Sequence, residues 1–220
     1  AIMLAILIST AAISWNFPSP FIVMLSYIGI FAAAIASVVT FGFWMPFIGF
    51  IINPRPYLAP KTWLVFAFGE GFFIGLISLS FETMFPGIVL EAVSLTFCVA
   101  ATLLFLYKSG IVKPSQNFVL MVCSAVFGIF LFYIGTLIYS LVTGVSPEIF
   151  SGSSNASIGL SLFIVAMAAF SLVLDFDIIE QSAEYGSPKY MEYFGAMALV
   201  TTLIWLYIEI LRLLAKFRSR

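Results

Sequence analysis

Apolar runs of about 20 residues recur along the whole chain and restrict it to one class of fold. Each run is long enough to cross the roughly 30 Å hydrocarbon core of a bilayer as an α-helix. The runs are apolar on all sides and lack the alternation expected of a transmembrane β-strand. Of the 220 residues, 63% are hydrophobic, against about one half in soluble domains, and the mean hydropathy is +1.17. We therefore predict an all-α, multi-pass membrane protein.

Turns rich in proline, glycine and serine divide these runs into seven expected transmembrane spans. The connections are too short for a second folded unit, so a single domain is expected. The second span is too long for a perpendicular crossing, and tilt or a break at Gly42 or Pro46 would accommodate the excess. The expected spans are residues 1–15, 21–52, 62–81, 88–107, 117–142, 158–179 and 190–217.

The distribution of basic residues bears on orientation and partners. With seven spans, the loops that hold Arg55, Lys61, Lys108, Lys113 and Lys189 lie on one side, which the positive-inside rule makes cytoplasmic. The basic C-terminal tail lies on the other side, so the orientation stays open. The net charge is −1 and no basic run precedes that tail, so nucleic-acid binding is not expected.

The inventory of reactive side chains argues against catalysis and against a stable metal site. The chain has no histidine, so any pH sensing would depend on carboxylates. Cys98 and Cys123 lie inside apolar runs, and no further Cys or His completes a site, so we interpret them as packing residues. No Gly-rich phosphate loop, Ser-His pair or aspartyl-protease Gly-x-Gly-Asp motif is present. We expect a protein that is not an enzyme and holds no tightly bound cofactor.

Carboxylates inside the apolar runs are the candidate functional residues, because only nine basic and ten acidic residues occur in the chain. A charge at the centre of a bilayer costs a few kcal/mol, and such residues usually face a partner or a pathway. Asp175 shares a helix face with Ser171. Glu209 lies on a polar stripe with Thr202, and either pairs with Arg212 three residues later or borders a water-accessible interior. Both alternatives stay open.

Two further acids lie in the earlier runs. Glu70 precedes Gly71 and Gly75, a pair of small residues that permits close helix packing, so Glu70 belongs either to a packing face or to an ion path. Glu91 lies on a stripe of small and polar residues that includes Ser94. We expect that stripe to face protein and not lipid. By contrast, Asp177 and Glu180 follow Asp175 where the helix leaves the membrane, and we expect water around them.

Several short motifs resemble one known family over essentially the whole chain. They are LDFD at 174–177, AEYG at 183–186, WLYIEILR at 205–212, IVLEA at 88–92 and the Glu70-Gly71 pair. This pattern resembles the Bax inhibitor-1, or transmembrane Bax-inhibitor-motif, family. The connection IEQSAEYG at 179–186 is most similar to its bacterial YccA-like branch, which implies a location in the bacterial inner membrane.

The resemblance implies a seven-helix bundle with the last helix at its centre, acting as a pH-sensitive calcium leak. In the family, acids on the sixth and seventh helices pair across the pore, and an arginine at the end of the second helix latches onto them. The matching positions are Asp175, Glu209 and Arg55, and Glu91 matches a glutamate of the fourth helix. Asp175 and Glu209 would bind Ca²⁺ weakly as it passes, because few acids and no ligand loop are present.

The spacing of the two acids opposes a direct contact. Asp175 and Glu209 are 34 residues apart, about nine more than expected, which on one continuous helix displaces Glu209 by about 13 Å. The alternative function is a non-conducting regulator of membrane stress or cell death. It would act through protein partners that the sequence does not identify, and its buried acids would be structural.

Overall fold

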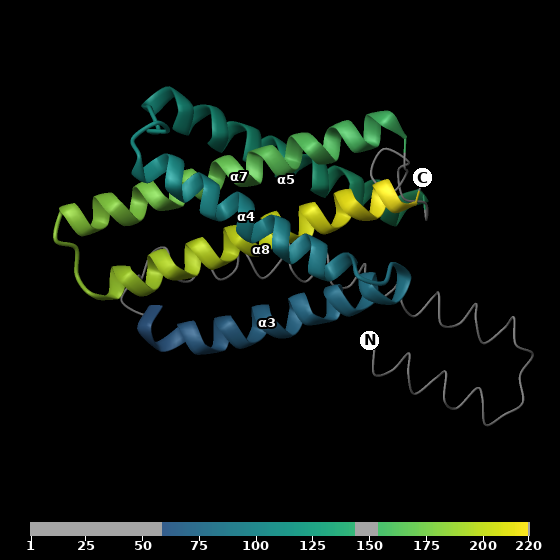
Figure 1. Ribbon diagram of the computed structural model, residues 1–220, viewed down its shortest axis with the longest axis horizontal. Coiled ribbons are helices and arrows are strands. Elements are labelled where there is room, and N and C mark those ends of the chain that lie inside the picture. The colour runs from purple at the N-terminus through teal and green to yellow at the C-terminus, as the bar shows by residue number, and fades with distance from the viewer. Residues whose placement is uncertain (1–58, 144–153, 220) are drawn as a thin grey trace, which may run out of the picture.

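The computed structural model describes residues 59–143 and 154–219, and these residues form helices and short turns without a strand (Figure 1). Five expected spans, residues 62–81, 88–107, 117–142, 158–179 and 190–217, each coincide with a helix to within five residues at each end. The expected spans 1–15 and 21–52 lie outside the described residues. The helices are α3 (Ala59–Met84), α4 (Ile88–Lys108), α5 (Gln116–Thr143), α7 (Asn155–Glu184) and α8 (Tyr190–Arg218).

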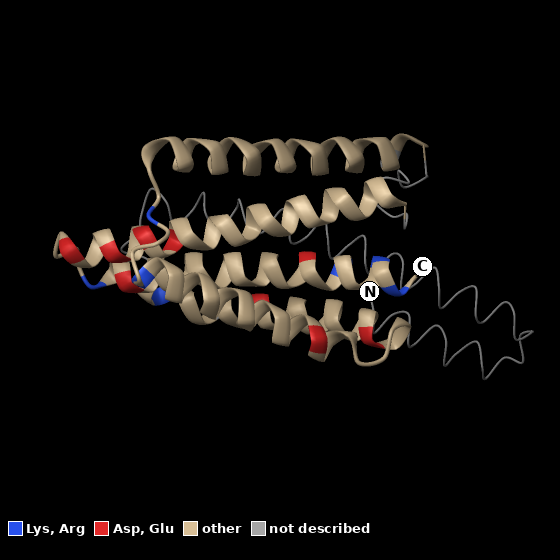
Figure 2. Cartoon of the chain, turned by 45° about the horizontal axis from the view of Figure 1, so that its top comes forward, with Lys and Arg blue, Asp and Glu red and all other residues tan. Residues whose placement is uncertain are grey.

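All five helices are long and apolar enough to cross a membrane. Large apolar side chains such as Phe68 and Leu90 are exposed, at 78% and 73% of their full area, and would contact lipid. Figure 2 shows that most charged residues gather near the two ends of the helices, with few along their middle. The described part of the chain is therefore that of an integral, multi-pass membrane protein.

The last helix, α8, lies at the centre of the described helices. Six consecutive residues from Leu206 to Leu211 are buried. Six residues cover more than one full turn, so this part of α8 is enclosed on every side. α3, α4 and α7 each pack against it, and their side chains form one core with this segment. The expectation of a central last helix agrees with this arrangement.

The turn between α3 and α4 is held by a side chain of α3. Gly87 adopts a left-handed conformation with φ 84°, which costs glycine little. The Glu82 carboxylate accepts hydrogen bonds from the backbone N–H groups of Gly87, at 2.6 Å, and Val89, at 3.2 Å. These two groups belong to the start of α4, where N–H groups have no partner within the helix. Glu82 thus sets where α4 begins and how it leaves α3.

Close approach of α7 and α8 depends on a glycine that the sequence did not single out. A Cβ atom added at Gly195 would lie 2.9 Å from Cγ1 of Ile179. By contrast, no described atom lies within 4 Å of such an atom at Gly71 or Gly75. The expectation that this pair of glycines serves close packing therefore finds no support among the described residues.

Candidate functional site

One face of α8 carries a residue of interest every seven positions, and this face meets α7. A Cβ atom added at Gly195 would meet Ile179 of α7. Thr202 lies near the carboxyl group of Asp175 on α7. Lys216 hydrogen bonds to Ser157 and Ser161 near the start of α7. Seven residues are close to two helical turns, so positions 195, 202, 209 and 216 share this face.

The same contacts define the register of the two antiparallel helices. Position 202 is paired with position 175 and position 216 with position 161, so Glu209, midway between them, lies opposite Ala168. Ala168 is buried in the core that the middle of α8 forms. Glu209 therefore lies seven residues, about 10 Å, along α8 from the level of Asp175. The structure does not bring the two predicted acids into one pair.

Glu209 is instead held by a compact polar network between α5 and α8. The Tyr133 hydroxyl donates to Glu209 Oε1 at 2.7 Å. Arg212 Nη1 donates to Oε1 at 3.0 Å and to Oε2 at 3.1 Å. The same Arg212 nitrogen lies 3.1 Å from the Tyr133 hydroxyl, and the guanidinium lies 5.7 Å from the centre of the Tyr133 ring. Each polar group of the three is bonded to both others.

This network compensates the charge of Glu209 within the bundle. The Glu209 side chain is 2% exposed and that of Arg212 17% exposed. A buried carboxylate needs a partner of opposite charge, and the pair with Arg212 provides one. Of the two alternatives for Glu209, pairing is the one that the structure shows. The expected latch, Arg55, lies outside the described residues.

Asp175 has a different environment, although it lies on the same interface. Thr202 lies near its carboxyl group, and its Oδ2 atom is buried without a hydrogen-bond partner among the described residues. No arginine or lysine forms an ion pair with it in that part of the chain. A carboxylate oxygen without a partner in such a place is a ready ligand for a proton or a cation.

Glu70 is the second acid with an unpartnered buried oxygen. Its side chain is 7% exposed, and its Oε2 atom has no hydrogen-bond partner among the described residues. Phe66, Ile74 and Ile77 of the same helix all pack against α8 or the core around it. Glu70 lies at the same helical face as these residues, at positions i+4, i−4 and i−7 from them, so it faces α8.

Glu91 does not lie inside the bundle. Its side chain is 53% exposed, and its Oε1 atom accepts from Arg218 Nη2 at 2.7 Å. Ser94 is also exposed, whereas Ile88, Ala92 and Thr96 form the buried face of α4. The expectation that the stripe of Glu91 and Ser94 faces protein was wrong, because small residues at helical spacing do not reveal which face is covered.

Lys216 is a buried cation whose partners sequence reasoning did not identify. It is 7% exposed. Its Nζ atom donates to Ser157 Oγ and Ser161 Oγ, each at 2.7 Å, and to the Ser157 carbonyl oxygen at 3.3 Å. Three acceptors match the three donors of an ammonium group. Ser157 and Ser161, four residues apart on α7, were the sequence signal for this contact.

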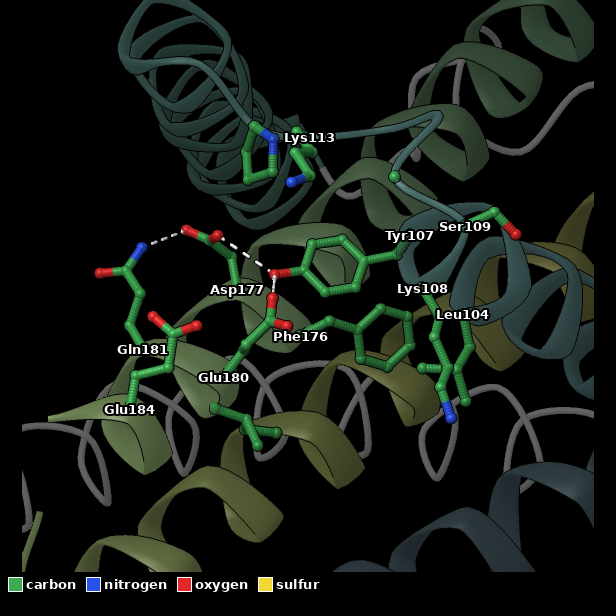
Figure 3. Close-up of a pocket in the computed structure, with 13 residues that line it drawn as sticks. Leu104, Tyr107, Lys108, Ser109, Lys113, Phe176, Asp177, Glu180, Gln181 and Glu184 are labelled. Atoms are coloured by element: carbon green, nitrogen blue, oxygen red, sulfur yellow. Dashed lines mark hydrogen bonds between the residues drawn. The ribbon is translucent and has the colours of Figure 1, made fainter. Parts of the chain in front are cut away.

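A polar cleft of about 660 Å³ lies at the end of the helices where α4 finishes and α7 finishes. Figure 3 shows the Tyr107 hydroxyl between the carboxylates of Asp177 and Glu180, to both of which it donates. Gln181 binds the other oxygen of Asp177 at 2.6 Å. Asp177 is half-buried and Glu180 exposed, so the expectation of water around them holds for Glu180 and only in part for Asp177.

The described residues include no group of three or more His, Cys, Asp or Glu side chains that could hold a metal ion. Asp175 and Glu209 were predicted to bind calcium weakly, yet both oxygens of Glu209 already accept hydrogen bonds from Arg212. The arrangement can therefore offer a cation single carboxylate oxygens at Asp175 and Glu70. Such a set suits brief contact with a largely hydrated ion better than storage.

Comparison with known proteins gives one match. A family model described as Bax inhibitor 1 like matches residues 1–219, which is almost the entire chain. No curated protein matches the chain, and no solved structure does.

Proposed function

Because the chain belongs to the Bax inhibitor 1 like family, we propose that it is a pH-sensitive calcium leak channel of the membrane in which it resides. The observation that carries the proposal is the buried Oδ2 atom of Asp175, which has no hydrogen-bond partner among the described residues. An acid in that position is costly unless it serves a partner or a pathway. Membership of the bacterial YccA-like branch, and with it the bacterial inner membrane, is part of this proposal.

We propose that the ion moves along the polar face of α8. Thr202, Glu209 and Lys216 follow one another along that face at two-turn intervals, and Trp205 and Arg212 lie beside them. A cation that moves along this face would meet Asp175 at the level of Thr202. Ca²⁺ prefers hard oxygen ligands and takes six to eight of them, so water would complete its shell.

Protonation explains why such a leak would respond to pH. A protonated Asp175 is neutral and gives up its attraction for a cation, whereas the carboxylate attracts one. Flux should therefore rise as pH rises through the titration of Asp175 and fall as the carboxyl group is protonated. Glu209 contributes differently, because Arg212 neutralises it, and we propose that it shapes the route and does not bind the ion.

The proposal is tested with purified protein in liposomes that contain a calcium-sensitive dye. We expect wild-type protein to admit Ca²⁺ with a rate that increases from acidic to mildly alkaline pH. Asp175→Asn should abolish both the flux and its pH dependence. Asp177→Asn is the matched control, since it makes the same change two residues later in the cleft at the end of the helix, and should leave flux unchanged.

The alternative function predicts a different result in the same liposomes. A regulator that acts only through protein partners would give no calcium flux in any variant, and its buried acids would serve the fold alone. An unaltered flux in Asp175→Asn would also contradict the proposal.

A further inference from the structure

We propose that the polar cleft between the ends of α4 and α7 binds a bilayer phospholipid with a phosphoethanolamine headgroup. The cleft has a volume of about 660 Å³, within the range of roughly 300–1,000 Å³ that is typical of small-molecule sites. It lies beside the turn that joins α4 to α5, at the end of the molecule where α4 and α7 both finish (Figure 3). The site is separate from the proposed ion route and does not depend on calcium conduction.

The two walls of the cleft carry opposite charges. Lys108 and Lys113 belong to the end of α4 and the turn after it, whereas Asp177, Glu180 and Glu184 belong to the last turns of α7. Figure 3 shows Lys113 on one side of the cleft and the three acids on the other. A ligand in this cleft therefore meets positive charge on one side and negative charge on the other.

These opposite charges do not neutralise each other by direct contact. Both ion pairs found among the described residues lie outside the cleft. The Lys113 side chain instead folds back over the turn, where its Cε atom would lie 3.6 Å from a Cβ atom added at Gly110. Unlike charges that line one cleft without touching leave room for a ligand that carries both signs.

The acids on α7 keep oxygen atoms available to such a ligand. Tyr107 and Gln181 each donate to one oxygen of Asp177, at 3.2 and 2.6 Å. The Tyr107 hydroxyl also donates to Oε2 of Glu180, and this holds the two acids side by side. Oε1 of Glu180 and both oxygens of Glu184 have no hydrogen-bond partner among the described residues. These free oxygens are acceptors for an ammonium group.

A zwitterion fits this charge pattern better than a simple ion does. Three carboxylates would repel an anionic headgroup, and two ammonium groups would repel a metal cation. The described residues also include no group of three or more His, Cys, Asp or Glu side chains that could hold a metal ion. The lysines would bind the phosphate by charge-assisted hydrogen bonds. The primary ammonium of ethanolamine donates three hydrogen bonds to carboxylates, as a lysine does, whereas choline has no N–H donor.

Apolar side chains beside the charges favour a lipid over a soluble ligand. Leu104 and Phe176 line the cleft about one helical turn inside Lys108 and Glu180. Leu104 and Ile179 are 48% and 38% exposed, so the described helices do not cover them. Figure 2 shows charged residues gathered at the ends of the helices, where headgroups lie when helices of this length span a bilayer. The headgroup would occupy the charged part of the cleft and the acyl chains would follow the apolar part.

Native mass spectrometry of the purified protein in detergent tests the proposal, because it measures the fraction of protein that retains a phospholipid. Dioleoyl phosphatidylethanolamine, phosphatidylcholine and phosphatidylglycerol are compared at equal concentration, since they differ only in their headgroups. We expect the wild type to retain phosphatidylethanolamine in preference to the other two. Lys113→Gln and Glu184→Gln should each weaken this retention about two- to fivefold, the size of an exposed ionic contact.

The same two variants should act in opposite directions on phosphatidylglycerol. Glu184→Gln removes a negative charge and should increase its retention, whereas Lys113→Gln should decrease it. Lys189→Gln and Glu192→Gln are the matched controls, because they make the same changes at exposed positions that do not line the cleft. Both controls should leave retention of all three lipids unchanged. The four substituted side chains are exposed, so we expect every variant to fold.

Equal retention of the three lipids by the wild type would overturn the proposal. So would cleft variants that behave like their controls. An equimolar amount of glycerophosphoethanolamine, which has the headgroup without acyl chains, tests the source of the ligand. If it displaces the lipid, the cleft binds a soluble phosphoethanolamine compound and the assignment to a lipid is wrong. These measurements involve no calcium flux, so failure here and failure of the proposed leak are told apart.

Discussion

The described part of this protein contains two Glu–Arg ion pairs that differ in burial and in N–O distance. Comparing them shows which of the two properties determines how much an ion pair contributes to the stability of the protein. Glu209 and Arg212 are 3.0 Å apart with side chains 2% and 17% exposed. Glu91 and Arg218 are closer, at 2.7 Å, but 53% and 34% exposed. Distance alone would make the second pair stronger. Because removal of one partner leaves an uncompensated charge inside the protein, we expect Glu209→Gln to cost about 3–5 kcal/mol. The exposed pair should lose about 0–1 kcal/mol in Glu91→Gln.

The measurement is the free energy of unfolding in detergent micelles for both single variants and for the matching double variants. Glu209→Gln with Arg212→Met removes both charges and should recover much of the loss, since a buried pair replaced by neutral side chains is often tolerated. A double-mutant cycle gives the coupling energy directly. Equal losses in Glu209→Gln and Glu91→Gln, or no coupling between Glu209 and Arg212, would refute the reasoning.

Two more predictions concern the α7–α8 interface. Gly195→Ala places a methyl group 2.9 Å from Ile179 Cγ1 and should lower the unfolding free energy by about 1–3 kcal/mol. Adding Ile179→Ala removes the clashing atoms and should recover part of this loss. If the double variant recovers nothing, the clash is not the cause. Ser157→Ala combined with Ser161→Ala leaves the Lys216 ammonium without its hydroxyl partners and should also destabilise the protein in the same assay, by about 1–3 kcal/mol. Lys216→Met in that double variant should restore stability, and a further loss would show that Lys216 has another partner.

Much of the helical fold could be predicted from the sequence, because lipid imposes a simple rule. A span must be apolar over about 20 residues, and the pattern located all five described helices. Packing was harder to predict. Gly71 and Gly75 looked suited to a helix contact, whereas Gly195 provides it. In a chain that is apolar on every face, hydrophobic periodicity does not distinguish lipid from a neighbouring helix.

The candidate site could be predicted only in part. The acids themselves were identified from their position inside apolar runs, and the large spacing of Asp175 and Glu209 already opposed a direct pair. The sequence also indicated Arg212 as one possible partner of Glu209. It did not indicate Tyr133, which lies on α5, 76 residues before Glu209 in the chain.

The register of α7 against α8 is tested most directly by measuring distances between the two helices at the levels of the two predicted acids. Spin labels at positions 175 and 202, or at 175 and 209, can be compared by pulsed electron resonance in the membrane-embedded protein, with Cys98 and Cys123 replaced by serine. We expect the 175–202 pair to be the closer one by several ångströms, because Glu209 lies about 10 Å further along α8. An equal or shorter 175–209 distance would contradict the account and restore a direct pair of Asp175 with Glu209.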